Sequence, residues 1–287
     1  MGRRKGWIAG VASLLVVLGA VCGAPRCLSA GEQKSYTVAV VPRHPPLVIE
    51  RDWTPLLLRL SAASGYQLVL KFYKSFADFE REVAKGIPDF VFLNPYHAAV
   101  AKKSRGYVPL VRDDEQPLVG ILVVKKDGAI TSVQDLNGKE IVFPAPNAFA
   151  ASLYIRSLLT QRERVRFTPK YVGTHSNVYR HVVLGFALAG GGVAGTLQRE
   201  SPELRNELRV IYETPGVQPH PLCAHPRVPA VVREAVTNAV LRFAQDDEGR
   251  ALLRAVRIPR PVRAEYERDY AMLEHLELER YIIKGRD

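Results

Sequence analysis

The side chains that most often carry chemistry, histidine and cysteine, are dispersed along this chain. Seven histidines occur in the 287 residues, and no HExxH spacing or paired-cysteine spacing supplies the ligands of a zinc site. His175 and His181 are six residues apart, so they do not meet on one face of a helix. Cys223 is the one cysteine after residue 30 and follows Leu222 in an apolar segment, so we expect a buried, unreactive thiol. The sequence therefore predicts no metal site, no cofactor and no enzymatic nucleophile.

Polar residues that could hold a ligand come directly after short apolar runs. Asn94, Tyr96 and His97 follow one such run, and the loop at 42–46 follows another. Apolar runs of this length, bounded by Gly and Pro, are typical of buried strands. Ligands of parallel sheets bind beyond the carboxyl ends of the strands. We therefore expect these side chains to lie around one ligand cleft.

The elements that position these residues alternate in a regular order. Short apolar runs alternate with helical patterns from residue 36 onward, and a second cycle of the same kind begins near 118. This order predicts an α/β fold with open, largely parallel sheets. Two crossings between the cycles, near 116–120 and near 215–222, predict two lobes with a cleft between them. The first lobe would comprise 36–118 and 220–287, and the second would comprise 119–219.

Several element boundaries are marked by capping residues. Thr54-Pro55 predicts a helix start, because Pro is favoured at the first helical position, and Gly65 ends that helix. Ser75 and Asp78 predict the next helix start, which Gly86 terminates. The run at 190–192 is all glycine and indicates a tight turn or a close approach of neighbouring backbone. Tyr266, Tyr270 and Leu273 predict a last amphipathic helix.

The first 30 residues have the layout of a secretory signal peptide. Arg3, Arg4 and Lys5 precede an uncharged apolar run at 7–21, and small residues follow. The run is short for a stable membrane span. Cleavage after Ala24 or Ala30 leaves a periplasmic protein, whereas lipoprotein anchoring through Cys22 and an uncleaved anchor are the alternatives. We expect export to the periplasm.

The charge of the chain is positive but dispersed. The formal net charge is +11, and it falls to +7 when the four basic residues of the first 30 positions are left out. Lysines and arginines are interspersed with acids, and no dense basic run with aromatic residues occurs. A basic surface favours anionic ligands in general. We expect no nucleic-acid partner, because the basic residues form no contiguous patch in the sequence.

The chain resembles the phosphate, phosphite and phosphonate group of periplasmic solute-binding proteins, the soluble components of ABC importers. The resemblance rests on the order and spacing of four segments: PLVGILVVKKD at 117–127, SVQDLNGK at 132–139, GTHS at 173–176 and DDEGRALL at 246–253. It implies a two-lobed periplasmic binding protein fold of type II that closes on a ligand by a hinge motion. It also implies binding without catalysis.

The resemblance assigns ligand contacts to particular positions. Tyr96 matches a contact from the first lobe, residues 147–151 match the helix start that holds the anion, and His175 matches a contact from the second lobe. The chain departs from the family where hydroxyl groups usually receive the oxyanion, because Phe149 and alanines occupy that turn. Leu188 stands where an acidic residue is usual. Each lost charge-assisted hydrogen bond is worth about 1.5–3 kcal/mol.

This loss of polarity leads to a main hypothesis and an alternative. The main hypothesis is a carrier of a largely apolar ligand, a lipid and possibly a sterol, with Phe149 and Leu188 as an apolar wall and an RND-type lipid transporter as partner. The alternative is an ABC-importer protein for phosphonate, phosphate or another small oxyanion, with an ABC permease as partner. In the alternative, Phe149 and Leu188 point into the lobe core and backbone N–H groups bind the anion. The expected ligand-binding residues in either case are Asn94, Tyr96, His97, Asn147, Phe149, His175 and Leu188.

Overall fold

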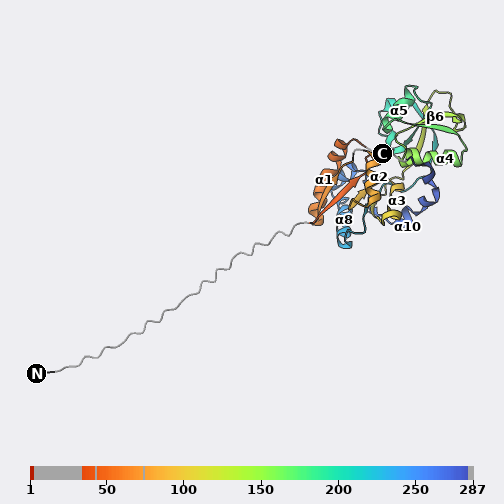
Figure 1. Cartoon of the computed structure of the whole chain (residues 1–287). Helices are drawn as coiled ribbons and strands as arrows, with labels where there is room; N and C mark the ends of the chain where they lie inside the picture. Colours follow the sequence, from red (N-terminus) through yellow and green to blue (C-terminus); the bar gives the residue numbers. More distant parts are fainter. Residues whose placement is uncertain (3–33, 43, 74, 284–287) are drawn as a thin grey trace. The chain divides into compact units, whose positions relative to one another are not determined.

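The structure is a computed structural model and describes residues 1–2, 34–42, 44–73 and 75–283. The chain divides into two units, Met1–Gln33 and Lys34–Asp287. All the helices and strands described lie in the second unit (Figure 1). The predicted signal peptide lies outside the described residues, apart from its first two. Of the helices that the structure describes, none combines the length and apolar content that crossing a bilayer requires.

A six-stranded sheet with the order β11-β4-β10-β3-β1-β2 forms the centre of the first lobe. β1 pairs in parallel with β2 and β3, whereas β10 runs antiparallel between β3 and β4, and β11 runs antiparallel to β4. The strands are β1 (Ser35–Val40), β2 (Gln67–Lys71), β3 (Phe90–Phe92), β4 (Val108–Asp113), β10 (Leu222–Ala224) and β11 (Pro261–Arg263).

Helices cover both faces of this sheet. Alternate strand residues point to opposite sides, and here both faces carry apolar side chains that need to be buried. Phe90 and Phe92 belong to one apolar cluster, and Val91 belongs to another. The helices α1 (Pro46–Ser64), α8 (Ala230–Phe243) and α9 (Asp247–Ala255) pack on the first cluster, and α2 (Phe76–Lys85) and α3 (Pro95–Arg105) pack on the second. In Figure 1 the orange α1 and the blue α8 accordingly lie in one lobe although they are far apart in the sequence.

A five-stranded sheet with the order β7-β6-β8-β5-β9 forms the second lobe. β6 runs parallel to β7 and β8, and β5 runs antiparallel to β8 and β9. Its strands are β5 (Gly120–Lys125), β6 (Lys139–Phe143), β7 (Phe167–Tyr171), β8 (Ala189–Val193) and β9 (Leu208–Glu213).

The helices of the second lobe also lie on both faces of its sheet. A π-helical turn, η2 (Phe149–Tyr154), continues into α4 (Ile155–Gln161) on one face, and α5 (His175–Val183) packs on the other. Three short helices complete the lobe: η1 (Gln134–Leu136), α6 (Ala194–Leu197) and α7 (Pro202–Asn206). Figure 1 shows β6 between α4 and α5.

The chain ends in three short turns that contact both lobes. These are α10 (Tyr266–Asp269), η3 (Ala271–Leu276) and η4 (Leu278–Tyr281). Their apolar side chains Tyr270, Leu273 and Leu278 share a cluster with Tyr96 of α3 and Leu153 of η2. The prediction of one continuous last helix is therefore wrong. Short turns allow these side chains to pack against both α3 and η2.

The predicted caps are present where the sequence marks them. The Ser75 hydroxyl accepts a hydrogen bond from the N–H of Asp78 at 3.1 Å, and Gly86 ends α2 with φ 73°. Gly65 ends α1 with φ 78°. The predicted start of α1 at Thr54 is wrong, since the helix begins at Pro46 and passes through Pro55. Apolar residues on the buried face, including Ile49 and Trp53, favour that earlier start.

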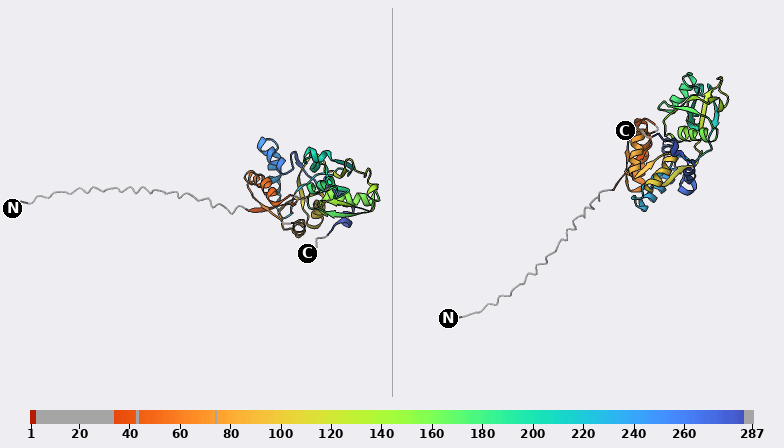
Figure 2. Two further views of the ribbon diagram at one scale, coloured as in Figure 1. Left: turned by 90° about the horizontal axis from the view of Figure 1, so that it is seen from above. Right: turned by 45° about the vertical axis from the view of Figure 1, so that its right-hand side comes forward.

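The chain crosses between the two sheets twice, between β4 and β5 and between β9 and β10. An isolated bridge between Leu118 and Val217 joins the two crossing segments. The right-hand view of Figure 2 separates the green residues of the second sheet from the orange and blue segments of the first. We propose lobe boundaries at 118/119 and 219/220, as the sequence predicts.

Candidate functional site

A cleft of about 580 Å³ is lined by residues of both lobes and of both crossing segments. Its walls include Pro42 after β1 and Asn94 after β3, together with segments after β6, β7 and β8. β1 and β3 pair in parallel in the first sheet, and β6 pairs in parallel with β7 and β8 in the second. The carboxyl ends of these strands meet at the cleft. The position agrees with the general rule for ligands of open α/β sheets. We take this cleft as the candidate binding site.

Backbone amides at the start of η2 face this cleft. Ala148, Phe149, Ala150 and Ala151 all line it. The first hydrogen bonds of the helix are donated by the N–H groups of Ser152 and Leu153 to the carbonyl of Ala148. Among the described residues, the N–H groups of Phe149, Ala150 and Ala151 have no acceptor. Such unpaired amides at a helix start, together with the helix dipole, are a binding site for an anion.

Two glycines allow this helix start to lie so close to the sheet. A Cβ atom at Gly120 would lie 2.2 Å from the Ala150 carbonyl oxygen, and one at Gly191 would lie 2.3 Å from that of Ala151. Side chains at these positions would therefore push η2 away from the strands. Gly190 and Gly192, with the glycine at 195, also show G-x-G-x-x-G spacing, but the first two lie within β8 rather than in a phosphate-binding turn. The glycine run is thus a site of close packing, one of the two predicted roles.

A second helix start opens on the same cleft. Thr174 and His175 line it, and the Thr174 hydroxyl caps α5 by accepting from the N–H of Asn177 at 3.1 Å. The positive end of the α5 dipole therefore points toward the cleft. Two helix N-termini, one in η2 and one in α5, face the same volume. This arrangement favours a ligand with a negatively charged group.

The predicted site residues divide into three groups in the structure. Asn94, Phe149 and His175 line the cleft. Asn94 does so as the cap of α3, where its Oδ1 accepts from the N–H of His97 at 2.8 Å. The ring of Phe149 is 3% exposed and stacks on Tyr154 at 5.5 Å. Phe149 thus offers its backbone to the cleft while its ring packs in the core, which corrects its predicted role as an apolar wall.

A second group, Tyr96, His97 and Asn147, is buried and does not belong to the residues that line the cleft. His97 Nε2 lies 2.8 Å from Glu80 Oε1, and the Asn147 side-chain amide donates to the same carboxylate at 3.3 Å. Burial, followed by the charges of Glu279 and Glu80, raises the pKa of Tyr96. His97 and Asn147 thus contact Glu80, while the Tyr96 hydroxyl has no hydrogen-bond partner among the described residues, and a ligand contact by any of the three stays a prediction.

Leu188 lies apart from the other predicted residues. It is 48% exposed and directly precedes β8, whereas Val193 at the other end of that strand lines the cleft. A strand rises about 3.3 Å per residue, so the length of β8 separates Leu188 from the cleft. The prediction that Leu188 forms an apolar wall is wrong for this cleft.

Three arginines that the sequence prediction missed line the cleft: Arg199, Arg254 and Arg257. Arg199 is far from the other two in the sequence, and no motif marks any of them. The cleft also contains two acids, Asp113 and Glu115. The Asp113 carboxylate accepts from the N–H of Arg260 at 2.8 Å and from that of Glu115 at 3.1 Å. Its charge is therefore already engaged by the protein backbone.

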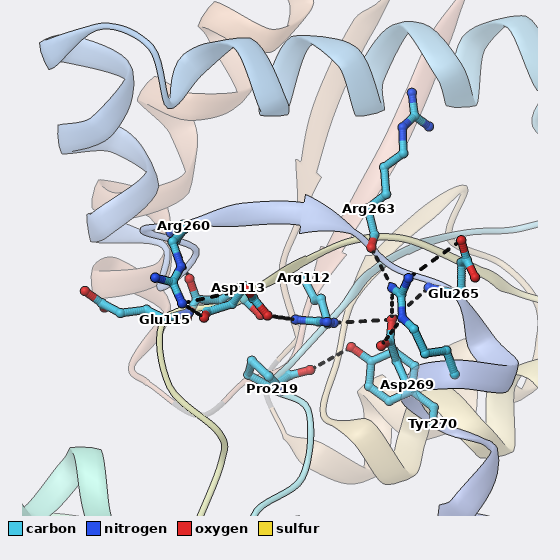
Figure 3. Close-up of polar contacts among 11 residues, drawn as sticks. Arg112, Asp113, Glu115, Pro219, Arg260, Arg263, Glu265, Asp269 and Tyr270 are labelled. Atoms are coloured by element: carbon cyan, nitrogen blue, oxygen red, sulfur yellow. Dashed lines mark hydrogen bonds and ion pairs between the residues drawn. The ribbon is translucent and has the colours of Figure 1, made fainter.

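A buried ion-pair network supports the wall beside Asp113 (Figure 3). Arg112 pairs with Asp114 at 2.7 Å and with Asp269 at 3.2 Å, and Arg268 holds Asp269 at 2.8 Å. The Asp269 side chain is 1% exposed. Burial alone would raise the pKa of Asp269, but hydrogen bonds from Arg268, from the Glu265 N–H and from Arg112 outweigh it and hold that pKa below its usual value. The network ties the first crossing segment to the C-terminal turns.

The same turns hold the second crossing segment. The Tyr270 hydroxyl donates to the carbonyl of Pro219 at 2.8 Å (Figure 3), and Pro219 lines the cleft. Both crossing segments are therefore held by the same C-terminal residues, Asp269 and Tyr270. A network of this kind fixes the position of the chain where the lobes join.

The described residues contain no group of three or more His, Cys, Asp or Glu side chains that could hold a metal ion. Cys223 is 1% exposed within β10, and burial raises the pKa of its thiol. Because thiolate is the reactive form, this thiol is chemically quiet. The donors placed at the cleft are backbone amides and guanidinium groups, and such groups favour anionic ligands.

Comparison with known proteins gives one family and a shared fold. The sequence model described as "ABC transporter, phosphonate, periplasmic substrate-binding protein" matches residues 38–270. No curated protein sequence matches the chain.

Three similar solved structures cover most of the chain. A binding protein component of an ABC phosphonate transporter from Pseudomonas aeruginosa has a TM-score of 0.74 at 15% identity, covering 87% of this chain and 88% of its own. A Prochlorococcus marinus protein in complex with methylphosphonate has a TM-score of 0.76 at 14% identity, covering 88% and 100%. A Xanthomonas citri protein bound to ATP has a TM-score of 0.75 at 14% identity, covering 87% and 100%. These likenesses show the two-lobed α/β fold of type II periplasmic binding proteins.

Proposed function

Because the chain belongs to the periplasmic substrate-binding proteins of phosphonate ABC transporters, we propose that it binds a phosphonate or related small oxyanion and presents it to an ABC permease. The observation that carries this proposal is the start of η2, where the amides of Phe149, Ala150 and Ala151 face the cleft without an acceptor among the described residues. Three N–H groups at a helix start can donate hydrogen bonds to the oxygens of a phosphonate group. The start of α5 adds a second positive dipole end.

The absence of hydroxyl side chains from the turn at 147–151 is the basis of the apolar-ligand hypothesis. The geometry favours its alternative, since the amides need no particular side chain. Phe149 has its ring in the core, and Leu188 is outside the cleft. The two residues that were to make the apolar wall therefore supply none. We do not retain the lipid carrier or its RND-type partner as the leading function.

Two of the similar proteins carry anionic ligands, methylphosphonate in one case and ATP in the other. They support an anion as the ligand class of this chain, although each ligand belongs to the protein in which it was found. The family also supports a periplasmic location. The signal-like layout of residues 1–30 agrees with that location, and we propose that this segment directs export.

A charge placed beside the amides tests the proposal. Ala148 lines the cleft as the residue that caps η2. Ala148→Glu puts a carboxylate against the incoming anion, and Ala148→Gln adds nearly the same volume without charge. We expect Ala148→Glu to weaken binding of methylphosphonate and inorganic phosphate at least about tenfold more than Ala148→Gln, a difference of about 1.4 kcal/mol. Isothermal titration calorimetry of the mature protein measures both.

The control and the contrary outcomes are distinct. Thermal denaturation of the two variants establishes that both remain folded. An equal loss in both variants would mean that charge at the helix start plays no part in binding. Absence of heat with either anion, together with lipid in solvent extracts of the purified protein, would restore the apolar-ligand hypothesis.

A further inference from the structure

Three arginines converge on the cleft from its two sides. Arg199 follows α6 in the second lobe, and Arg254 and Arg257 lie at the end of α9 in the first lobe. Their side chains are exposed to solvent. Within the described part of the chain, no acidic side chain forms an ion pair with any of the three. The cleft therefore presents three guanidinium groups whose donors are available.

The acids near these arginines compensate their charges only in part, because Glu200 interacts favourably with Arg199 but forms no ion pair with it in the described part of the chain. Of the two acids in the lining, Asp113 is engaged by two backbone N–H groups, and Glu115 is one charge against three. Partial desolvation by the surrounding protein, and then repulsion by Arg257, lower the pKa of Arg199. Like charges that face one volume of solvent are relieved when an anion enters between them.

The backbone of Arg257 allows its side chain to be removed without loss of stability. The N–H of Ile258 donates to the carbonyl of Leu253 at 2.9 Å, and that of Arg257 donates to the carbonyl of Arg254 at 3.2 Å. These two bonds form a Schellman motif, whose C′ position usually holds glycine. Arg257 occupies that position with φ 70°, a conformation that disfavours any residue with a side chain. Glycine would fit this backbone better, so Arg257→Gly removes the guanidinium group without straining the fold.

The arginines also exceed what one small phosphonate needs. Three amides and the start of α5 match the oxygens of a single head group. Each guanidinium adds several further N–H donors in a planar fork suited to carboxylate or phosphate. The cleft volume of about 580 Å³ is in the range of sites for drug-sized ligands, much larger than methylphosphonate requires.

We propose that Arg199, Arg254 and Arg257 form a subsite for a second oxyanion, so that the ligand is a phosphonate or phosphate ester with an anionic group at each end. The first anionic group binds the amides of η2, and the second is held between the arginines of the two lobes. This proposal rests on the proposed function and names the ligand class within it. A ligand held in this way bridges the lobes and stabilises their contact.

Two probes and two variants test the subsite. Methylphosphonate has one anionic group, whereas 3-phosphonopropionate adds a carboxylate. We expect the wild-type protein to bind 3-phosphonopropionate at least about tenfold more tightly than methylphosphonate by calorimetry. We expect Arg257→Gly and Arg199→Gln each to reduce that ratio by at least about fivefold.

A matched control exists elsewhere in the chain. Arg164 also has a positive φ, 57°, is exposed and does not line the cleft. Arg164→Gly removes the same charge and relieves the same backbone conformation, so the ratio should stay at the wild-type value. Arg257→Gly should be at least as heat-stable as the wild type, which separates loss of binding from loss of folding.

The outcomes distinguish the two proposals. If both probes bind equally, or if the arginine variants leave the ratio unchanged, the second subsite is refuted while oxyanion binding stands. The same holds if Arg164→Gly lowers the ratio as much as Arg257→Gly, because the effect would then be one of net charge. If neither probe binds the wild-type protein, the proposed function itself fails and the subsite fails with it.

Discussion

At the scale of single residues, the site depends on groups that sequence patterns do not display. Phe149 appears in the sequence as an aromatic ring, but its contribution to the cleft is a backbone N–H. Asn94 is expected at the cleft because its loop follows a buried strand, and His175 is expected there from the family resemblance; both line the cleft. Arg257 could have been suspected, since the end of an amphipathic helix favours glycine where this chain has arginine. Nothing local identifies Arg199.

The buried carboxylate of Asp269 gives a residue-scale prediction. Because its pKa is lowered in the folded protein, its stabilising effect is complete above the unfolded pKa and disappears as the pH falls through the folded value. We expect Asp269→Asn to lower the free energy of unfolding by about 3 kcal/mol or more at pH 7. The deficit should shrink below about pH 4. Urea denaturation at a series of pH values measures both effects.

Asp114 provides the control for Asp269, since it pairs with the same Arg112 but is 46% exposed. Asp114→Asn should cost less than about 1 kcal/mol, because water screens an exposed pair. Equal losses in the two variants, or a deficit for Asp269→Asn that persists unchanged in acid, would contradict the electrostatic explanation.

At the scale of elements, the alternation of apolar runs and the capping residues predicted most of the helices and strands. They did not predict β10. The alternation of the first cycle, the caps of α2 and the glycine at the end of α1 are confirmed. The prediction of largely parallel sheets is wrong, because β10, β11, β5 and β9 pair antiparallel with their neighbours. β10, with Cys223 at its centre, lies within a proline-rich stretch and is only three residues long, too short to show a period. Its place between β3 and β4 is set by tertiary packing, which no local pattern encodes.

The position of Pro55 inside α1 gives an element-scale prediction. Proline in a helix interior is about 3 kcal/mol less favourable than alanine, and the stiffer unfolded chain offsets about 0.4–1 kcal/mol of that. Pro55 is exposed, so its removal creates no cavity. We therefore expect Pro55→Ala to raise the free energy of unfolding by about 2 kcal/mol, measured by thermal or chemical denaturation.

Pro46 serves as the comparison, because it is also exposed but occupies the first position of the same helix. Proline is tolerated there, so Pro46→Ala should leave stability nearly unchanged. A melting temperature that falls in Pro55→Ala would show that the proline supports a bend on which the lobe depends.

At the scale of the whole folded unit, one polar cluster joins the lobes and the C-terminal segment. Glu80 of α2 in the first lobe contacts Asn147 of the second, and Asn147 exchanges two hydrogen bonds with the backbone of Ile283, at 3.1 and 3.2 Å. The predicted ligand contacts Tyr96, His97 and Asn147 gather here instead of in the cleft. The contacts of His97 Nε2 and of the Asn147 amide belong to this joint, whereas the Tyr96 hydroxyl has no hydrogen-bond partner in the described part of the chain.

A change of charge tests this joint. Asn147→Asp places a second carboxylate beside Glu80, and like charges in a largely buried site repel. We expect the variant to lose about 1–3 kcal/mol of stability at pH 7. Glu80→Gln in the same protein should restore part of the loss. Thermal denaturation of the four proteins of this double-mutant cycle gives the coupling energy, and additive effects would show that the two side chains do not interact across the joint.

The position of β10 between β3 and β4 has a consequence for the order in which strand pairs can form. The strands from residue 120 to 213 form a complete sheet from one continuous stretch, and β1, β2 and β3 pair with one another from another. β4 joins its sheet through β10 and β11, which begin about a hundred residues or more after it. The first sheet can therefore be completed only after the chain has passed through the second lobe and returned.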